Sequence, residues 1–243
     1  MHELAWDPAA RPVVVLLTIA AVVYTLKHYV LAAARWQARF ADAGAPPVEA
    51  QRRGVLVRRL TAGALLFGGM VGAEVVAGLE PIAEALRTPP GLSTVAFVAG
   101  AMAVLGPILW MSGKKADLQA AQPEVRAPVQ TPAMVTRGWL AWAVYLFGYE
   151  YLFRGALLFG LAGTLGVWPA LAVTTALYAL VHLPKPLMGE TLGSIAMGFV
   201  FGAMALGTGG LWAPWLVHLG IVLVTETSAG RHNPEIAWWS RTE

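Results

Sequence analysis

Residues 93–112 read STVAFVAGAMAVLGPILWMS, twenty residues without a charged side chain. A helix that crosses the hydrocarbon core of a bilayer needs about 20 mostly apolar residues. The chain is therefore predicted to be an all-α, polytopic transmembrane helix bundle of about seven spans, with eight as the alternative count. The seven segments that have this character lie at about 12–34, 61–79, 93–112, 138–160, 164–182, 190–207 and 209–227.

The composition also indicates a chain embedded in lipid. Of the 243 residues, 57% are hydrophobic and 13% are charged, whereas an ordinary soluble domain carries about 25% charged residues. The chain has no cysteine, which excludes a disulfide framework and a thiolate zinc site. The net charge of +3 comes from basic residues in short loops beside apolar segments, so membrane topology explains it. We expect the lipid bilayer, and no nucleic acid, as a partner.

The charges of the loops predict the orientation of the chain. The stretch 35–60 carries six arginines against two acids, loop 113–137 is also basic, and loop 80–92 is acidic on balance. Basic loops stay on the cytoplasmic side of a membrane. We therefore expect an integral protein of a prokaryotic inner, or plasma, membrane, with its N-terminus outside and its C-terminus in the cytoplasm.

An Ala/Pro-rich stretch separates the third predicted span from the fourth. We expect a three-helix transmembrane scaffold at 1–117, a cytoplasmic linker at 118–137, a second helix bundle at 138–228 and a cytoplasmic tail at 229–243. The polar residues inside the apolar segments concentrate after the linker. Function is therefore predicted to reside in the second bundle.

Ionisable side chains inside the apolar segments are the candidate functional residues, because each is costly in lipid without a partner or water. Glu150 and Arg154 stand four residues apart, which puts both on one helical face where they can pair. A buried ion pair that only holds the helix in place is the alternative. The other candidates are Lys27, His28, Glu74, His182 and His218, with Glu226 at the edge of the last segment.

The later segments repeat these spacings. Tyr178 and His182 stand four residues apart at the end of the fifth segment, and Glu226 follows His218 by two turns on one face. Glu74 suits a hydrogen bond to a neighbouring helix as well as a functional role. A carboxylate and an imidazole can together activate an attacking water, and a second imidazole can stabilise the oxyanion formed at an amide carbonyl. A divalent metal held by Glu150, His182 and His218 is the alternative chemistry.

At these residues the chain resembles the CPBP intramembrane proteases, also called the Abi or CAAX protease family, which include the type II CAAX prenyl endopeptidases. The family motifs are a Glu-Glu-x-x-x-Arg helix, a Phe-x-x-x-His helix end and a final His-x-x-x-Asn helix. The order and spacing match, and the resemblance covers about residues 138–228. The corresponding stretches here are YEYLFR at 149–154, YALVH at 178–182 and HLGIV at 218–222.

Three positions depart from the family pattern. Tyr149 stands where the first glutamate is usual, Tyr178 replaces the phenylalanine, and Val222 replaces the asparagine. The chain looks like a single-Glu variant of the first motif, in a branch where a Lys-Pro pair follows the second-motif histidine, as Lys185-Pro186 does here.

The resemblance implies an intramembrane endopeptidase that hydrolyses a peptide bond of a membrane-anchored peptide or protein. Under this implication Glu150 and His182 activate water, His218 stabilises the oxyanion, and Arg154 orients Glu150 or binds a substrate carboxylate. Tyr149, Tyr178 and Glu226 are supporting residues. No cofactor is required, and a divalent metal such as zinc on Glu150, His182 and His218 is the alternative that we do not favour.

Two other functions use the same residues. The departures at Tyr149 and Val222 motivate a non-proteolytic relative that acts as an immunity factor, scaffold or binding partner. Buried charges also suit a small transporter, but the inverted repeats that such a protein would carry are not detected in the sequence.

Overall fold

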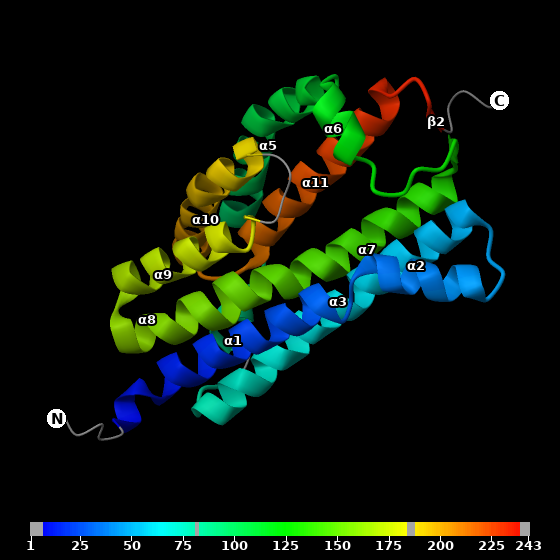
Figure 1. Cartoon of the computed structure of the whole chain (residues 1–243). Helices are drawn as coiled ribbons and strands as arrows, with labels where there is room; N and C mark the ends of the chain where they lie inside the picture. Colours follow the sequence, from blue (N-terminus) through cyan, green and yellow to red (C-terminus); the bar gives the residue numbers. More distant parts are fainter. Residues whose placement is uncertain (1–6, 81–82, 184–187, 239–243) are drawn as a thin grey trace. The chain divides into compact units, whose positions relative to one another are not determined.

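The computed structural model describes residues 7–80, 83–183 and 188–238, and most of them are helical (Figure 1). The N-terminal elements are η1 (Pro8–Ala10), α1 (Arg11–Tyr29), α2 (Ala33–Asp42), α3 (Pro47–Ala77), α4 (Ala83–Leu86), α5 (Leu92–Ser112) and α6 (Ala116–Ala121). The C-terminal elements are β1 (Val129–Gln130), α7 (Pro132–Glu150), η2 (Tyr151–Phe159), α8 (Gly160–Leu165), α9 (Val167–Leu180), α10 (Met188–Thr208), α11 (Trp212–His232) and β2 (Ala237–Trp238).

The helices confirm the predicted all-α class, because a helix covers most of each predicted apolar segment. Within the described residues, three helical stretches are long and apolar enough to cross a membrane: Pro8–Asp42, Pro47–Ala77 and Leu92–Ser112. Val167–Leu180 and Leu192–Thr208 are shorter apolar helices. The chain is thus a membrane-type helical bundle, and the number of crossings stays a prediction.

The chain divides into two compact units. The first unit comprises Met1–Tyr24, Leu66–Thr94 and Tyr149–Pro214, and the second comprises Thr25–Leu65, Val95–Gly148 and Trp215–Glu243. Each unit combines segments from before and after the predicted linker at 118–137. The division into scaffold, linker, bundle and tail therefore stays a prediction.

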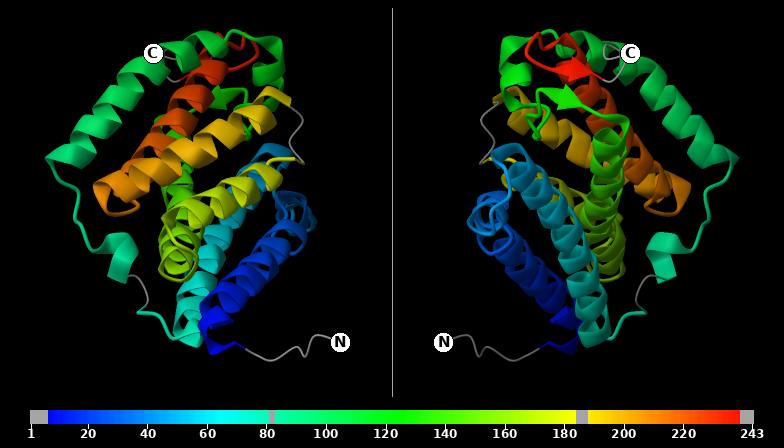
Figure 2. Two further views of the ribbon diagram at one scale, coloured as in Figure 1. Left: turned by 90° about the vertical axis from the view of Figure 1, so that its left-hand side faces the viewer. Right: turned by 90° about the vertical axis from the view of Figure 1, so that its right-hand side faces the viewer.

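In the first unit, η2 is the central element. It packs against α4, α8, α9 and α10. The helix α9 also packs against α10 (Figures 1 and 2). The side chains of η2 are buried from Tyr151 through Leu158. A helical segment that is buried on every side needs such enclosure by other helices. The segment directly after Glu150 is thus enclosed by its neighbours.

In the second unit, α3 and α7 approach closely. A side chain on Gly63 of α3 would meet the carbonyl oxygen of Val144 at 2.6 Å, and one on Gly148 of α7 would collide with the Gly63 carbonyl. Small residues at helix contacts allow this approach in membrane bundles. The same unit contains a parallel pairing of β1 with β2, in which Val129 faces Ala237.

Candidate functional site

The stretch YEYLFRG at 149–155 forms three neighbouring pairs of residues four apart. The carboxylate of Glu150 lies 3.0 Å from Nη1 of Arg154. On one side of this ion pair, the rings of Tyr149 and Phe153 lie 4.9 Å apart. On the other side, the ring of Tyr151 lies so close to Gly155 that an added Cβ would come within 2.8 Å of it. The local spacing therefore sets the geometry of this helical face, as the sequence predicted for the ion pair.

The helix changes character at this point. Glu150 is the last residue of α7, and Tyr151–Phe159 adopts the wider π-helical turn of η2. Single π-helical turns inside helices are rare and occur frequently at functional sites. A segment of this kind that contains Arg154 and directly follows Glu150 marks the region as a candidate site.

Aromatic rings surround the guanidinium of Arg154, which is 2% exposed. Its central carbon lies 4.2 Å from the Tyr178 ring centroid and 5.3 Å from that of Phe201. Nη2 also donates a hydrogen bond to the carbonyl of Gly198 at 3.3 Å. Ring faces attract a cation most strongly where water is excluded. Arg154 is thus held by Glu150, a carbonyl and aromatic faces.

His182 lies in the turn that follows α9. Its Nδ1 is 2.7 Å from the carbonyl oxygen of Tyr178. Because a carbonyl only accepts hydrogen bonds, Nδ1 donates, and in the neutral ring Nε2 is then the acceptor nitrogen. The His182 ring lies 4.7 Å from the ring of Tyr178 and 6.5 Å from that of Tyr149. Tyr149 and Tyr178 are two departures from the family pattern, and the centroids of their rings lie 5.7 Å apart.

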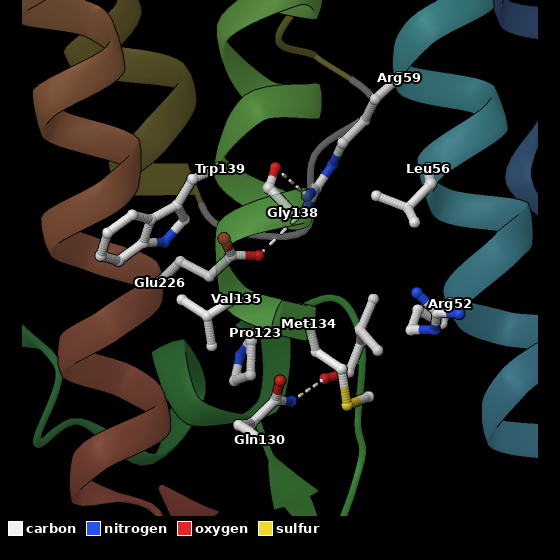
Figure 3. A pocket seen from close by; sticks show the side chains of 11 residues that line it. Arg52, Leu56, Arg59, Pro123, Gln130, Met134, Val135, Gly138, Trp139 and Glu226 are labelled. Carbon is white, nitrogen blue, oxygen red and sulfur yellow. Dashed lines mark hydrogen bonds and ion pairs between the residues drawn. The ribbon is translucent and has the colours of Figure 1, made fainter. Parts of the chain in front are cut away.

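Glu226 belongs to the second unit, where it accepts two hydrogen bonds. Nη2 of Arg59 donates to Oε1 at 3.2 Å, and the indole nitrogen of Trp142 donates to Oε2 at 3.1 Å. Arg59 is 1% exposed and also donates to the carbonyl of Gly138. Figure 3 shows Arg59 directed from α3 toward Gly138 and Glu226. Oε2 of a second acid, Glu124, lies 3.1 Å from Nη2 of Arg59.

A small cavity lies beside this network. Its volume is about 30 Å³, and Gln130, Met134 and Trp139 line it together with Arg59 and Glu226 (Figure 3). A cavity of this size holds one or a few water molecules. It is too small for a peptide, so it does not form a substrate site by itself.

The predicted site residues therefore fall into two groups. Glu150, Arg154 and His182, with the supporting Tyr149 and Tyr178, lie in the first unit, whereas His218 and Glu226 lie on α11 in the second. The approach of His218 to Glu150 stays a prediction. In the described parts of the chain, no three His, Asp or Glu side chains form a group that could hold a metal ion. The alternative metal set of Glu150, His182 and His218 draws on both units and stays a prediction.

Sequence reasoning missed three residues that contact the predicted ones. Arg59 stands in the basic stretch 35–60, whose charge predicts a cytoplasmic loop, but its side chain is buried against Glu226. Trp142 lies within an apolar segment, where nothing in the sequence distinguishes it. Tyr151 donates a hydrogen bond to Glu74, whose isolated position in an apolar segment was the available signal. Lys185 and Pro186 lie outside the described residues.

The fold and composition define an integral membrane protein of the all-α class. Residues 131–224 match the model of the family described as type II CAAX prenyl endopeptidase Rce1-like, which confirms the resemblance seen in the motifs. The chain thus carries an Rce1-like domain of the CAAX protease family, which supports a hydrolase at the level of the family. Comparison with curated proteins and with solved structures gives no significant match.

Proposed function

We propose that the chain is an intramembrane endopeptidase that hydrolyses a peptide bond in a membrane-anchored peptide or protein. The observation that carries the proposal is the buried carboxylate of Glu150, fixed at 3.0 Å from Arg154 in the same unit as His182. A buried, oriented carboxylate and an imidazole that reaches the same water are what general-base activation of that water needs. The match at residues 131–224 supports the same reaction class.

In the proposed reaction, a water molecule attacks the carbonyl carbon and passes a proton to the Glu150 carboxylate. His182 accepts a hydrogen bond from that water through Nε2, because Nδ1 donates to the Tyr178 carbonyl. His218 donates a hydrogen bond to the oxyanion of the tetrahedral intermediate. The carbon–nitrogen bond then breaks, and Glu150 returns its proton to the leaving amine.

Arg154 orients Glu150 in this mechanism. Its guanidinium already contacts the carboxylate, a carbonyl and the Tyr178 ring, and it is 2% exposed. Binding a substrate carboxylate would require the loss of these contacts. Of the two roles that the resemblance implies for Arg154, orientation of the base is therefore the better supported.

Glu226 supports His218 from the same helix. Arg59 of α3 and Trp142 of α7 both donate hydrogen bonds to Glu226, so the rotation of α11 about its axis is fixed within the second unit. Because His218 stands two turns before Glu226 on α11, the contacts of Glu226 also fix the direction in which the His218 side chain leaves the helix. The proposed reaction needs no cofactor. We also propose that the C-terminus of the chain lies in the cytoplasm of a prokaryotic cell.

A second candidate function is a non-proteolytic membrane protein that serves as a scaffold, immunity factor or binding partner. The specific observation in its favour is that Glu150 is 0% exposed and already paired with Arg154. A purely structural ion pair has the same features. The two candidates differ in what loss of the Glu150 charge does to cleavage.

The test is cleavage of membrane-anchored peptides by the full-length protein reconstituted in liposomes. One probe carries a prenylated C-terminus and a second carries a transmembrane signal-peptide remnant, with products identified by mass spectrometry. We expect Glu150→Gln and His182→Ala each to lower kcat by about 10² to 10⁴. Glu235→Gln, a matched change at an exposed position, leaves the rate unchanged. Full activity in both site variants would falsify the proposal.

A further inference from the structure

Tyr151 connects the candidate site to a helix that carries none of the family motifs. Its hydroxyl donates a hydrogen bond to Oε2 of Glu74 on α3. Tyr151 is 0% exposed and Glu74 is 6% exposed, and both belong to the first unit. A hydrogen bond to a buried carboxylate is stronger than one between neutral groups. This contact therefore fixes the start of η2 against α3.

The packing around Tyr151 leaves its ring little freedom. The Phe67 ring lies 4.6 Å away at an angle of 62°. On the other side, Gly155 has no side chain, and a Cβ there would come within 2.8 Å of the Tyr151 ring and 3.2 Å of Ala85. The ring is thus held between α3 and its own helix, with its hydroxyl at Glu74.

We propose that Glu74 is a positioning residue for Glu150 and acts through Tyr151. Tyr151 directly follows Glu150 and is the first residue of the π-helical segment. One residue corresponds to about 100° around a helix axis, so a change of register here turns the Glu150 carboxylate away from its present direction. The hydrogen bond to Glu74 opposes that change. The inference rests on the proposed function, because it assigns Glu74 a role in the reaction of Glu150.

The physical consequence is a rate effect rather than a binding effect. A displacement of about 1 Å in a catalytic group can lower a rate by about 10²-fold. Glu74 and Tyr151 are not assigned to substrate binding, so KM changes by less than about twofold. A purely structural contact would instead lower the folded fraction and leave kcat per folded molecule unchanged.

The experiment compares four test variants and one control variant of the full-length, reconstituted protein on the membrane-anchored peptide that the wild type cleaves. Glu74→Ala removes the acceptor and Tyr151→Phe removes only the donor hydroxyl, and we expect each to lower kcat about 10- to 100-fold. Glu74→Gln keeps an acceptor oxygen and restores most of the rate. The double variant Glu74→Ala/Tyr151→Phe is no slower than either single variant, because both remove one interaction. Val75→Ala, at an exposed neighbour, is the matched control.

Two kinetic results would overturn the inference while leaving the proposed function intact. One is unchanged kcat in Glu74→Ala and Tyr151→Phe when Glu150→Gln is inactive. The other is a Glu74→Gln variant as slow as Glu74→Ala. Hydrogen exchange of residues 149–159 tests the contact without any cleavage: both disruptive variants should exchange faster there, and unchanged exchange would contradict the inference. A Glu150→Gln enzyme that cleaves the peptide as fast as the wild type would instead contradict the proposed function.

Discussion

Each unit of the molecule contains a buried contact between a glutamate and an arginine, and the two contacts are built differently. Glu150 and Arg154 are four residues apart and lie at 3.0 Å, among aromatic rings. Glu226 and Arg59 are 167 residues apart and lie at 3.2 Å, within a network that includes Trp142. The first contact fixes one carboxylate beside one helix face, whereas the second connects α3, α7 and α11.

The difference indicates what each contact does. A network with several donors and acceptors distributes the cost of burying its charges over many partners. The Arg154 guanidinium that pairs with the Glu150 carboxylate lies against the Tyr178 and Phe201 rings, and a surrounding of low polarity strengthens the electrostatic interaction of the pair. We therefore propose that the local contact serves the reaction and that the long-range contact serves the assembly of helices.

The largest expected effect on stability follows from removing the arginine of the local contact. Arg154→Met leaves the Glu150 charge buried without its cation, which costs about 3–5 kcal/mol of unfolding free energy. Unfolding in detergent, followed by circular dichroism, measures the loss. The double variant Glu150→Gln/Arg154→Met has no uncompensated charge and should recover most of it. A double variant as unstable as Arg154→Met would contradict this explanation.

A smaller loss is expected from the long-range contact. Arg59→Met removes one donor from Glu226, but the Trp142 indole still donates to that carboxylate. We therefore expect a loss of about 2–3 kcal/mol, less than a full buried pair costs. The same unfolding measurement applies. If Arg59→Met is as damaging as Arg154→Met, the network does not distribute its charge as described.

The smallest effect concerns the packing beside the local contact. Gly155→Ala places a Cβ against the Tyr151 ring and Ala85, and overpacking of this kind costs about 1–3 kcal/mol. Gly163→Ala is the matched control, since a Cβ there meets nothing within 4 Å. Alanine favours a helix by about 1 kcal/mol over glycine, so the control should gain stability. Equal behaviour of the two variants would show that the Tyr151 ring is free to move.

Short-range patterns in the sequence predicted much of the fold and part of the site. Runs of apolar residues predicted the helices, because a bilayer requires about 20 such residues for each crossing. The four-residue spacing predicted the contact of Glu150 with Arg154, and the same spacing placed Tyr178 beside His182, whose rings are 4.7 Å apart. Both predictions depend only on helix geometry.

The remaining features depend on packing between distant segments. The sequence around Arg59 resembles a basic loop, and only the position of α11 shows that Arg59 is buried against Glu226. The π-helical turn of η2 has the same apolar composition as an ordinary helix, so periodicity does not distinguish it. The apolar segment around Glu74 predicts that this acid is buried, but its partner Tyr151 belongs to another helix and cannot be identified from spacing.

We propose that the Glu150 carboxylate performs chemistry and that the Glu226 carboxylate supports structure. The most direct measurement is the cleavage rate of Glu150→Gln and Glu226→Gln enzymes, side by side, on one membrane-anchored peptide. We expect Glu150→Gln to lose about 10² to 10⁴ in kcat while it stays folded. Glu226→Gln should lose less than about tenfold and unfold more easily. A Glu150→Gln enzyme as fast as the wild type would contradict the claim.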